Sequence, residues 1–299
     1  MTRNASLIGL TLLLAVSLGW GVSWPIFKFA LTEIPPWTFR ALCVGVGGFL
    51  LLIIALISDS KIPISRSQFV PLVILSIFNV TIWNMLSVYG VSLLSSGRAA
   101  IVGFTMPLWA VLFGAIMLNE NITHYKVIGL ILGLSGLICL LGTDLHSLQY
   151  SPIGTLLMLV AATSWGLGTV LVKYFRFTQS ALVLAGWQLV IGGIPIYIGA
   201  ITFEAQDLNM PNLWSSLAML YMIVISFVLC YWGWFKVLEY LPAGVAANCL
   251  LLVPMIGVAS GAIILGESIG WTELCALALI VTGIASIVLP SAHNAQTAR

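Results

Sequence analysis

The chain has 299 residues, of which 61% are hydrophobic and 7% are charged, and its formal net charge is +2. Soluble domains carry about 25% charged residues, so this composition excludes an ordinary soluble protein and indicates one that lies in a lipid bilayer. The sequence holds no tract of basic residues, which argues against nucleic acid as a partner.

Turn residues and charges divide the chain into apolar segments, each close to the roughly 20 residues that a helix needs to cross a bilayer. The ten expected spans are 6–31, 36–58, 69–92, 98–118, 123–142, 152–175, 179–201, 213–238, 243–265 and 271–290. The connections between them are short. We therefore predict an all-α membrane protein with ten transmembrane helices.

The first and sixth spans begin an internal repeat. Trp20, Gly21 and Lys28 in WGVSWPIFKF match the Trp, Gly and Lys of WGLGTVLVKY at 165–174, with an offset of 145. The stretch PLWAVLFGAIMLNE at 107–120 returns as PMIGVASGAIILGE at 254–267, with its proline, glycine and glutamate in register. Such a repeat predicts two five-helix halves, residues 1–146 and 147–299.

The second half must enter the bilayer upside down, because each half has an odd number of spans. Eight Lys and Arg residues then lie on the side of the N-terminus, and three, Lys28, Arg40 and Arg98, lie on the other side. This asymmetry predicts that both termini are cytoplasmic. Inverted repeats with a site near the middle of the membrane are typical of transporters.

The repeated motif supplies candidates for helix packing and for a helix corner: Pro107, Gly114 and Glu120, with their counterparts Pro254, Gly261 and Glu267. The prolines lie inside spans and permit bending. The glycines favour close approach of neighbouring helices. The glutamates follow the last apolar residue of a span, so the simpler interpretation is a structural corner, and the alternative is a gating contact.

The acidic residues all lie at the ends of spans or in loops, which argues against a buried metal, a catalytic dyad or a coupling carboxylate. We expect no metal and no cofactor. The spans hold aromatic and neutral polar groups instead. The candidates for lining a substrate cavity are Trp20, Trp24, Asn79, Trp83, Asn84, Ser87, Trp165, Gln188, Cys230, Tyr231 and Asn248.

The amides among these candidates are costly against lipid, so they should face a cavity or a neighbouring helix. A cavity of aromatic rings with a few amides suits a flat solute that is apolar or zwitterionic. Lys28, Arg40 and Lys173 could attract a substrate carboxylate. The simpler interpretation of these three is that they extend to the membrane interface.

The ten spans, the five-plus-five repeat, the W-G near the start of each half and the P-x6-G-x5-E motif together resemble the drug/metabolite transporter superfamily, EamA type. The resemblance covers nearly the whole chain. Within that superfamily the chain is similar to bacterial aromatic amino-acid exporters, which implies export through a central cavity between the halves. The small four-helix relatives use a membrane carboxylate in their first span, and this chain has none there.

These observations predict a monomeric transporter in the bacterial inner membrane. It would export aromatic or neutral amino acids, or similar metabolites, by alternating access and without ion coupling. Two alternatives stay open: a broad metabolite or drug exporter coupled to protons, and, more distantly, a membrane-embedded enzyme.

Overall fold

The computed structural model describes residues 3–58, 62–146, 152–206, 210–240 and 248–297, and all regular elements in them are helices. The first half contains α1 (Arg3–Ala30), α2 (Pro36–Ile57), α3 (Arg66–Ser76), η1 (Ile77–Ile82), α4 (Trp83–Leu93), α5 (Ser96–Gly103), α6 (Met106–Leu118) and α7 (His124–His146). The second half contains α8 (Pro152–Phe175), α9 (Ala181–Phe203), α10 (Leu213–Tyr221), η2 (Met222–Leu229), α11 (Cys230–Tyr240), α13 (Asn248–Leu265) and α14 (Trp271–Thr297). The symbol η marks a π-helical segment.

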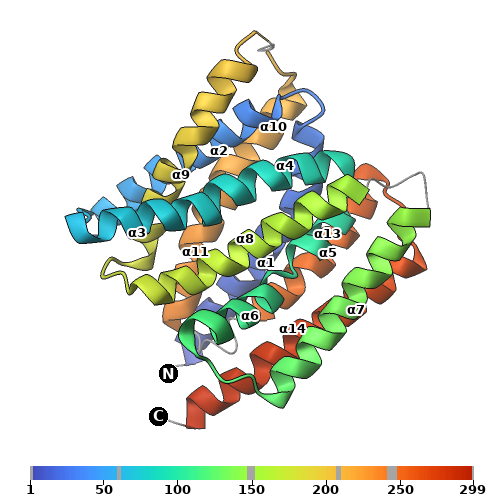
Figure 1. The fold of residues 1–299 in the computed structure, drawn as a ribbon. Helices are drawn as coiled ribbons and strands as arrows, with labels where there is room; N and C mark the ends of the chain where they lie inside the picture. Colours follow the sequence, from blue (N-terminus) through green and yellow to red (C-terminus); the bar gives the residue numbers. More distant parts are fainter. Residues whose placement is uncertain (1–2, 59–61, 147–151, 207–209, 241–247, 298–299) are drawn as a thin grey trace.

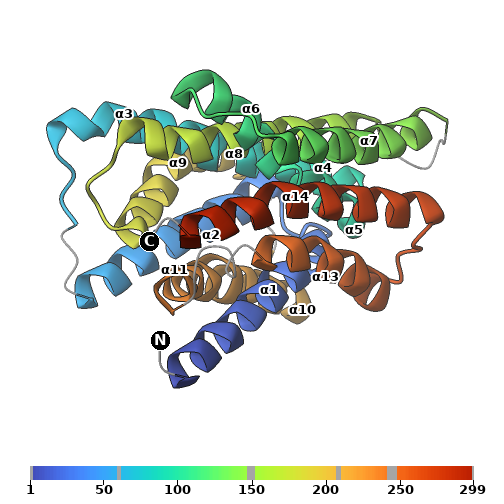
Figure 2. The same ribbon diagram turned by 90° about the horizontal axis from the view of Figure 1, so that it is seen from below.

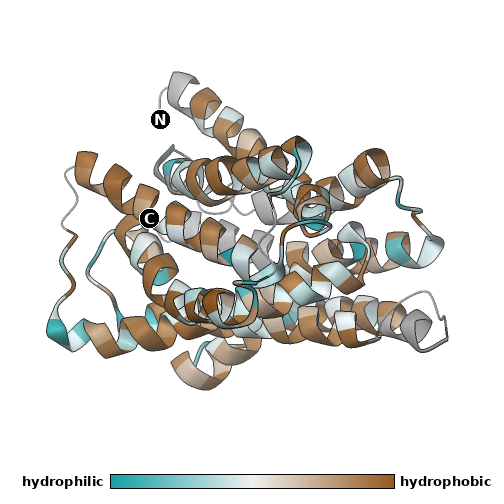
Figure 3. Ribbon diagram, turned by 90° about the horizontal axis from the view of Figure 1, so that it is seen from above, coloured by the Kyte–Doolittle hydropathy of each residue, from teal (hydrophilic) through white to brown (hydrophobic). Residues whose placement is uncertain are grey.

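The length and surface of these helices suit a bilayer. Seven helical segments of the described chain are long and apolar enough to cross a membrane, and three shorter apolar helices lie within α7, α13 and α14. Large apolar side chains face outward, and Ile57, Ile201 and Ile263 are each more than 70% exposed. Figure 3 shows apolar residues along the outer helices. The prediction of an all-α membrane protein with about ten helices is confirmed.

The two halves repeat each other in element positions as well as in sequence. The starts of α2 and α9 are 145 residues apart, and the starts of α7 and α14 are 147 residues apart. Equivalent helices pack along each other, α2 with α9 and α7 with α14. Helices α1 and α8 run in opposite directions (Figure 1), as an inverted repeat requires. The boundary at 146/147 stays a prediction, because residues 147–151 lie outside the described chain.

Glycines permit a close contact between α7 and α14. A Cβ on Gly283 would lie 2.8 Å from the carbonyl oxygen of Gly129 and 3.0 Å from the amide nitrogen of Gly133. Neither backbone atom can move aside cheaply, so this approach requires glycine.

The two repeated prolines affect their helices differently. Pro107 lies in the first turn of α6, and the preceding helix α5 ends at Gly103, so the expected fourth span is broken at Phe104–Thr105. A proline is tolerated in the first turn of a helix, where its missing N–H needs no partner. Pro254 lies inside α13, which continues through it to Leu265. The proline was expected to bend the helix in both halves. The helix is instead broken before Pro107 in the first half and continuous through Pro254 in the second.

The bundle has two ends, which we name the near end and the far end. The near end holds both chain termini and the α2–α3, α6–α7 and α8–α9 connections (Figures 1 and 2). The far end holds the α1–α2, α4–α5, α9–α10 and α13–α14 connections.

Candidate functional site

A cavity of about 420 Å³ lies between the halves, which is within the range of small-molecule sites. Helices α1, α2, η1, α4, α8, α9, η2 and α11 contribute to its wall. Eight of the eleven residues that the sequence singled out lie on this wall: Trp20, Trp24, Asn79, Trp83, Ser87, Trp165, Gln188 and Tyr231. Their role in binding a substrate stays a prediction.

Two of the sequence candidates, Asn84 and Cys230, do not line the cavity, and the structure does not test a third, Asn248. Asn84 of α4 is 2% exposed, and its amide donates to the carbonyl of Val80 in η1, four residues earlier in the same span. Cys230 packs against Gly19 of α1 and its Sγ lies 3.9 Å from the carbonyl of Val16. The side chain of Asn248 lies outside the described part of the chain.

Aromatic pairs join the two halves across the cavity. The Trp83 and Trp165 rings, from α4 and α8, are 4.3 Å apart between centroids and meet edge to face. Trp20 of α1 and Tyr231 of α11 are 5.8 Å apart and also meet edge to face. Edge-to-face packing is favourable for aromatic rings, so both sides of the cavity present an aromatic surface.

The two π-helical segments lie at equivalent places in the third span of each half and form part of the wall. A wide turn misaligns backbone carbonyls, which then need partners from elsewhere. Trp20 Nε1 of α1 donates to the carbonyl of Ser226 in η2, at 3.0 Å. Ser164 Oγ of α8 donates to the carbonyl of Phe78 in η1, at 2.7 Å. Each wide turn is thus held by a helix of the other half.

An amide pair from opposite halves lies on the wall. Asn79 Nδ2 donates to Gln188 Oε1 at 2.9 Å, and Asn79 Oδ1 has no hydrogen-bond partner among the described residues. Gly168 of α8 makes room for this amide, because a Cβ there would lie only 1.8 Å from Asn79 Oδ1. The free acceptor of Asn79 is therefore buried against α8 and does not open to the cavity.

Arg40 is the site residue that the sequence interpretation misplaced. Instead of extending to the interface, it is 4% exposed and lies on the cavity wall. Its guanidinium carbon lies 3.8 Å from the centroid of the Phe27 ring, and Nη2 donates to Ser87 Oγ at 3.2 Å. Arg40 lies one turn after the start of its span, and this position in the sequence does not indicate whether the side chain points to the interface or to the cavity.

The cavity differs at its two ends. At the near end its wall includes Thr169 and Ala181, which are exposed. At the far end its wall includes Phe27, Arg40 and Ser87, each no more than 4% exposed. The cavity is therefore closed toward the far end.

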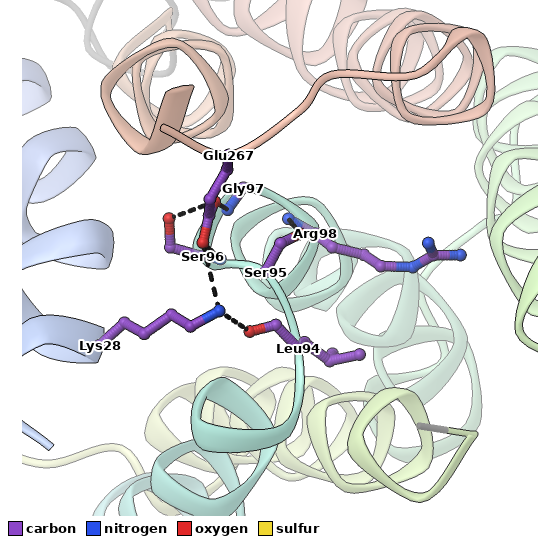
Figure 4. Close-up of polar contacts among 7 residues, drawn as sticks. All are labelled: Lys28, Leu94, Ser95, Ser96, Gly97, Arg98 and Glu267. Carbon is purple, nitrogen blue, oxygen red and sulfur yellow. Dashed lines mark hydrogen bonds and ion pairs between the residues drawn. The ribbon is translucent and has the colours of Figure 1, made fainter. Parts of the chain in front are cut away.

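Glu267 ties three helices together at the far end (Figure 4). Its carboxylate accepts from the Ser96 amide at 2.7 Å, from Ser96 Oγ at 2.8 Å and from the Gly97 amide at 3.2 Å. Lys28 of α1 lies 3.3 Å from the same carboxylate and also donates to the carbonyl of Leu94. A carboxylate at the first amides of α5 suits the helix dipole.

Arg98 points away from Glu267 (Figure 4) and forms a separate ion pair. Its Nη1 lies 3.0 Å from Glu273 of α14, and its Nη2 donates to the carbonyl of Leu140 at 2.7 Å. The Arg98 side chain is fully buried. This pair joins α5 to α7 and α14 behind the far-end closure.

Among the described residues, the side chain of Glu120, the counterpart of Glu267, pairs with two lysines at the near end. It lies 3.2 Å from Lys126 and 3.3 Å from Lys173, and its side chain is 37% exposed. Partial burial raises the pKa of Glu120, but the contacts with both lysines outweigh this and hold the pKa below its ordinary value. The pKa of Glu267 is lowered too, because its donors from Ser96, Gly97 and Lys28 outweigh the opposing effect of burial.

The repeated glycine allows each glutamate to turn back over its own helix. The Glu120 amide donates to the Gly114 carbonyl at 3.2 Å, and the Glu267 amide donates to the Gly261 carbonyl at 3.3 Å. The preceding residues, Asn119 and Gly266, have φ values of 52° and 66°. Left-handed residues of this kind end helices. The glycines therefore serve the corner, and Gly261 also lies against Ser96 of the neighbouring helix α5, as close helix packing requires.

Metal binding finds no support in the described chain, in which no group of three His, Cys, Asp or Glu residues is placed to hold an ion.

Comparisons with known proteins agree with this geometry. The profile of the EamA-like transporter family matches residues 7–142 and 152–289. "Uncharacterized transporter YvbV" of Bacillus subtilis is 30% identical over 287 residues, which cover 95% of this chain and 90% of that protein. A "Probable amino-acid metabolite efflux pump" of Salmonella typhimurium is 25% identical over 285 residues, covering 91% and 92%. A crystal structure with 21% identity, covering 99% of this chain and 100% of that one, matches with a TM-score of 0.66 and shows a like fold.

Proposed function

This chain belongs to the EamA-like transporter family and is a multi-pass membrane transporter, and from that premise we propose that it exports aromatic and other neutral amino acids or similar metabolites. The observation that carries the proposal is the aromatic cavity between the inverted halves, with Trp rings from both halves in its wall. Aromatic rings contribute stacking energy to flat ligands beyond the area that they bury. The efflux-pump name of one relative is consistent with this substrate class.

Transport proceeds by alternating access, in which the inverted halves exchange roles and the cavity opens to each side in turn. The near end faces the cytoplasm of a bacterial inner membrane, where both termini lie, and the protein acts as a monomer. None of the described lining residues is acidic. Membrane-buried carboxylates usually carry proton coupling, so movement is facilitated and uncoupled.

The test is flux into vesicles that contain the purified protein. Labelled tryptophan and phenylalanine, with leucine as an aliphatic comparison, are offered with and without a pH gradient. We expect saturable aromatic flux that is independent of the gradient. Empty vesicles and the variant Trp165→Ala, which removes one ring of the Trp83–Trp165 pair, serve as controls and should show little flux.

Two results would contradict the proposal. Flux that requires the pH gradient would favour the alternative, a proton-coupled exporter of broad range. Absence of flux for any amino acid would exclude the substrate class.

A further inference from the structure

We propose, on the basis of the transport function above, that the cavity recognises a carboxylate through Arg40 and does not recognise an amino group. The substrate class is then aromatic carboxylates in general, with or without an amino group. The carboxylate lies at the closed far end, and the ring lies between the Trp side chains toward the middle of the cavity.

The first argument is that Arg40 is a buried cation without a counter-ion. It is 4% exposed, and no carboxylate of the described residues lies within ion-pair distance of it. Its Nε has no hydrogen-bond partner among those residues. A buried charge is costly unless it is paired, so an anion in the cavity relieves a penalty that the empty protein carries.

The second argument is geometric. A guanidinium offers a planar fork of donors that matches the two oxygens of a carboxylate. The Phe27 ring lies under the guanidinium at 3.8 Å, and Ser87 Oγ accepts from one nitrogen at 3.2 Å. These two contacts fix the orientation of the fork at the end of the cavity.

The third argument concerns the amino group. In an amino acid the ammonium and the carboxylate are attached to the same carbon, so both lie near Arg40 when one binds there. The described lining residues include no acidic side chain that could pair with the ammonium. Desolvating an ammonium without a partner is unfavourable, so the amino group adds nothing to binding.

The amide pair lies too far away to serve that ammonium. Asn79, Trp83 and Ser87 all line the cavity, at intervals of four residues along the same span. Eight residues at no more than 1.5 Å each place Asn79 up to about 12 Å from Ser87 along the helix axis, and the wider winding of Ile77–Ile82 shortens this distance. Asn79 Oδ1 therefore lies toward the opposite end of the cavity from Arg40, and it is buried against Gly168.

The experiment compares three molecules with the same ring and chain. Titration calorimetry on the purified full-length chain in detergent measures the Kd of 3-phenylpropionate, phenylalanine and 2-phenylethylamine. We expect the acid to bind at least as tightly as the amino acid. The amine should bind at least about tenfold more weakly, the difference typical of one hydrogen-bonded charge.

Variants separate recognition from bulk charge. Arg40→Gln should weaken binding of the acid and the amino acid by about tenfold or more and leave the amine unchanged. Arg40→Lys keeps the positive charge but not the planar pair of donors, so its affinity for the acid should lie between the affinities of the wild type and of Arg40→Gln. Arg66→Gln, at an exposed position at the start of α3, removes the same charge and should change nothing.

If 3-phenylpropionate and 2-phenylethylamine bind the wild-type chain with equal Kd, the inference is overturned. This test needs only the wild-type chain, so it can be made even where Arg40→Gln does not fold. Equal affinities in the wild type, with a destabilised Arg40→Gln, would mean that Arg40 only joins helices. If the acid and the amine bind equally but the vesicles show amino-acid flux, the further inference is wrong and the proposed function is still supported. Selective acid binding without any amino-acid flux contradicts the proposed function alone.

Discussion

The far end and the near end of the bundle carry copies of the same corner motif, yet the two glutamates make different contacts. Glu267 is hydrogen-bonded to the first amides of α5 and paired with Lys28, whereas Glu120 pairs with two lysines among the described residues and is 37% exposed. Part of the difference can be seen in the sequence, at residues that the repeat did not keep, of which Ala243 lies outside the described chain. Ser96 corresponds to Ala243, which has no hydroxyl, and Lys126 corresponds to Glu273, which has the opposite charge. The motif fixes the backbone, and its neighbours decide whether the carboxylate joins helices.

The largest effect expected from breaking this asymmetry follows from Arg98→Met. It leaves Glu273 buried without its cation, and loss of one partner of a buried pair costs about 3–5 kcal/mol. Denaturant unfolding in detergent should show this loss of stability. Lys126→Met, at the near end, is the matched control and should cost less than about 1 kcal/mol, since its partner Glu120 is partly exposed. If Arg98→Met and Lys126→Met lowered the free energy of unfolding by the same amount, the ion pairs at the two ends would contribute equally to stability.

Glu267→Gln should open the far end without unfolding the chain. The substitution removes the negative charge that pairs with Lys28 and accepts hydrogen bonds from α5. The free energy that favours the closed far end should fall by about 1.5–3 kcal/mol. The readout is thiol labelling of Phe27→Cys in a background without other cysteines, with an impermeant reagent on the far side. Labelling should accelerate by about tenfold or more.

Glu120→Gln is the control for that experiment. Exposed ion pairs contribute about 0–1 kcal/mol, so its labelling rate should stay within about fivefold of the unsubstituted background. If Glu120→Gln opened the far end as much as Glu267→Gln, the contrast between the two corners would be wrong.

The smallest effect, in the same labelling assay, is expected from the glycines. A Cβ on Gly261 would lie 2.5 Å from Ser96 Oγ and 2.6 Å from Glu267 Oε2, so Gly261→Ala should separate these groups and weaken closure. A Cβ on Gly114 would lie 3.3 Å from Glu120 Oε2, where the side chain can shift. Gly114→Ala should therefore leave the rate unchanged. An unchanged rate in Gly261→Ala would show that the far end adapts easily.

The fold could be predicted because its signals are local. Apolar length gives the spans, and the repeated Trp-Gly and Pro-Gly-Glu patterns give the two halves. The family resemblance is confirmed by the match over both halves. The π-helical segments could not be foreseen, since Ile77–Ile82 and Met222–Leu229 read as ordinary apolar helix.

The site was harder to predict, because the neighbours of a side chain are set by helices that are distant in sequence. Asn79 and Asn84 are similar amides on one span, yet one faces the cavity and the other bonds to its own backbone. Arg40 and Lys28 both lie near the far end, and only the packing of Phe27 and Ser87 shows that Arg40 turns inward. The orientation of the termini stays a prediction.

The two π-helical segments have a mechanical consequence. Trp20 of α1 donates to a carbonyl of η2, and Ser164 of α8 donates to a carbonyl of η1. Converting either segment to α-helix would rotate the residues beyond it by about 100° per residue released and would break a bond made by the opposite half. A change of winding in either third span therefore acts on the helix of the other half that bonds to it, α1 for η2 and α8 for η1.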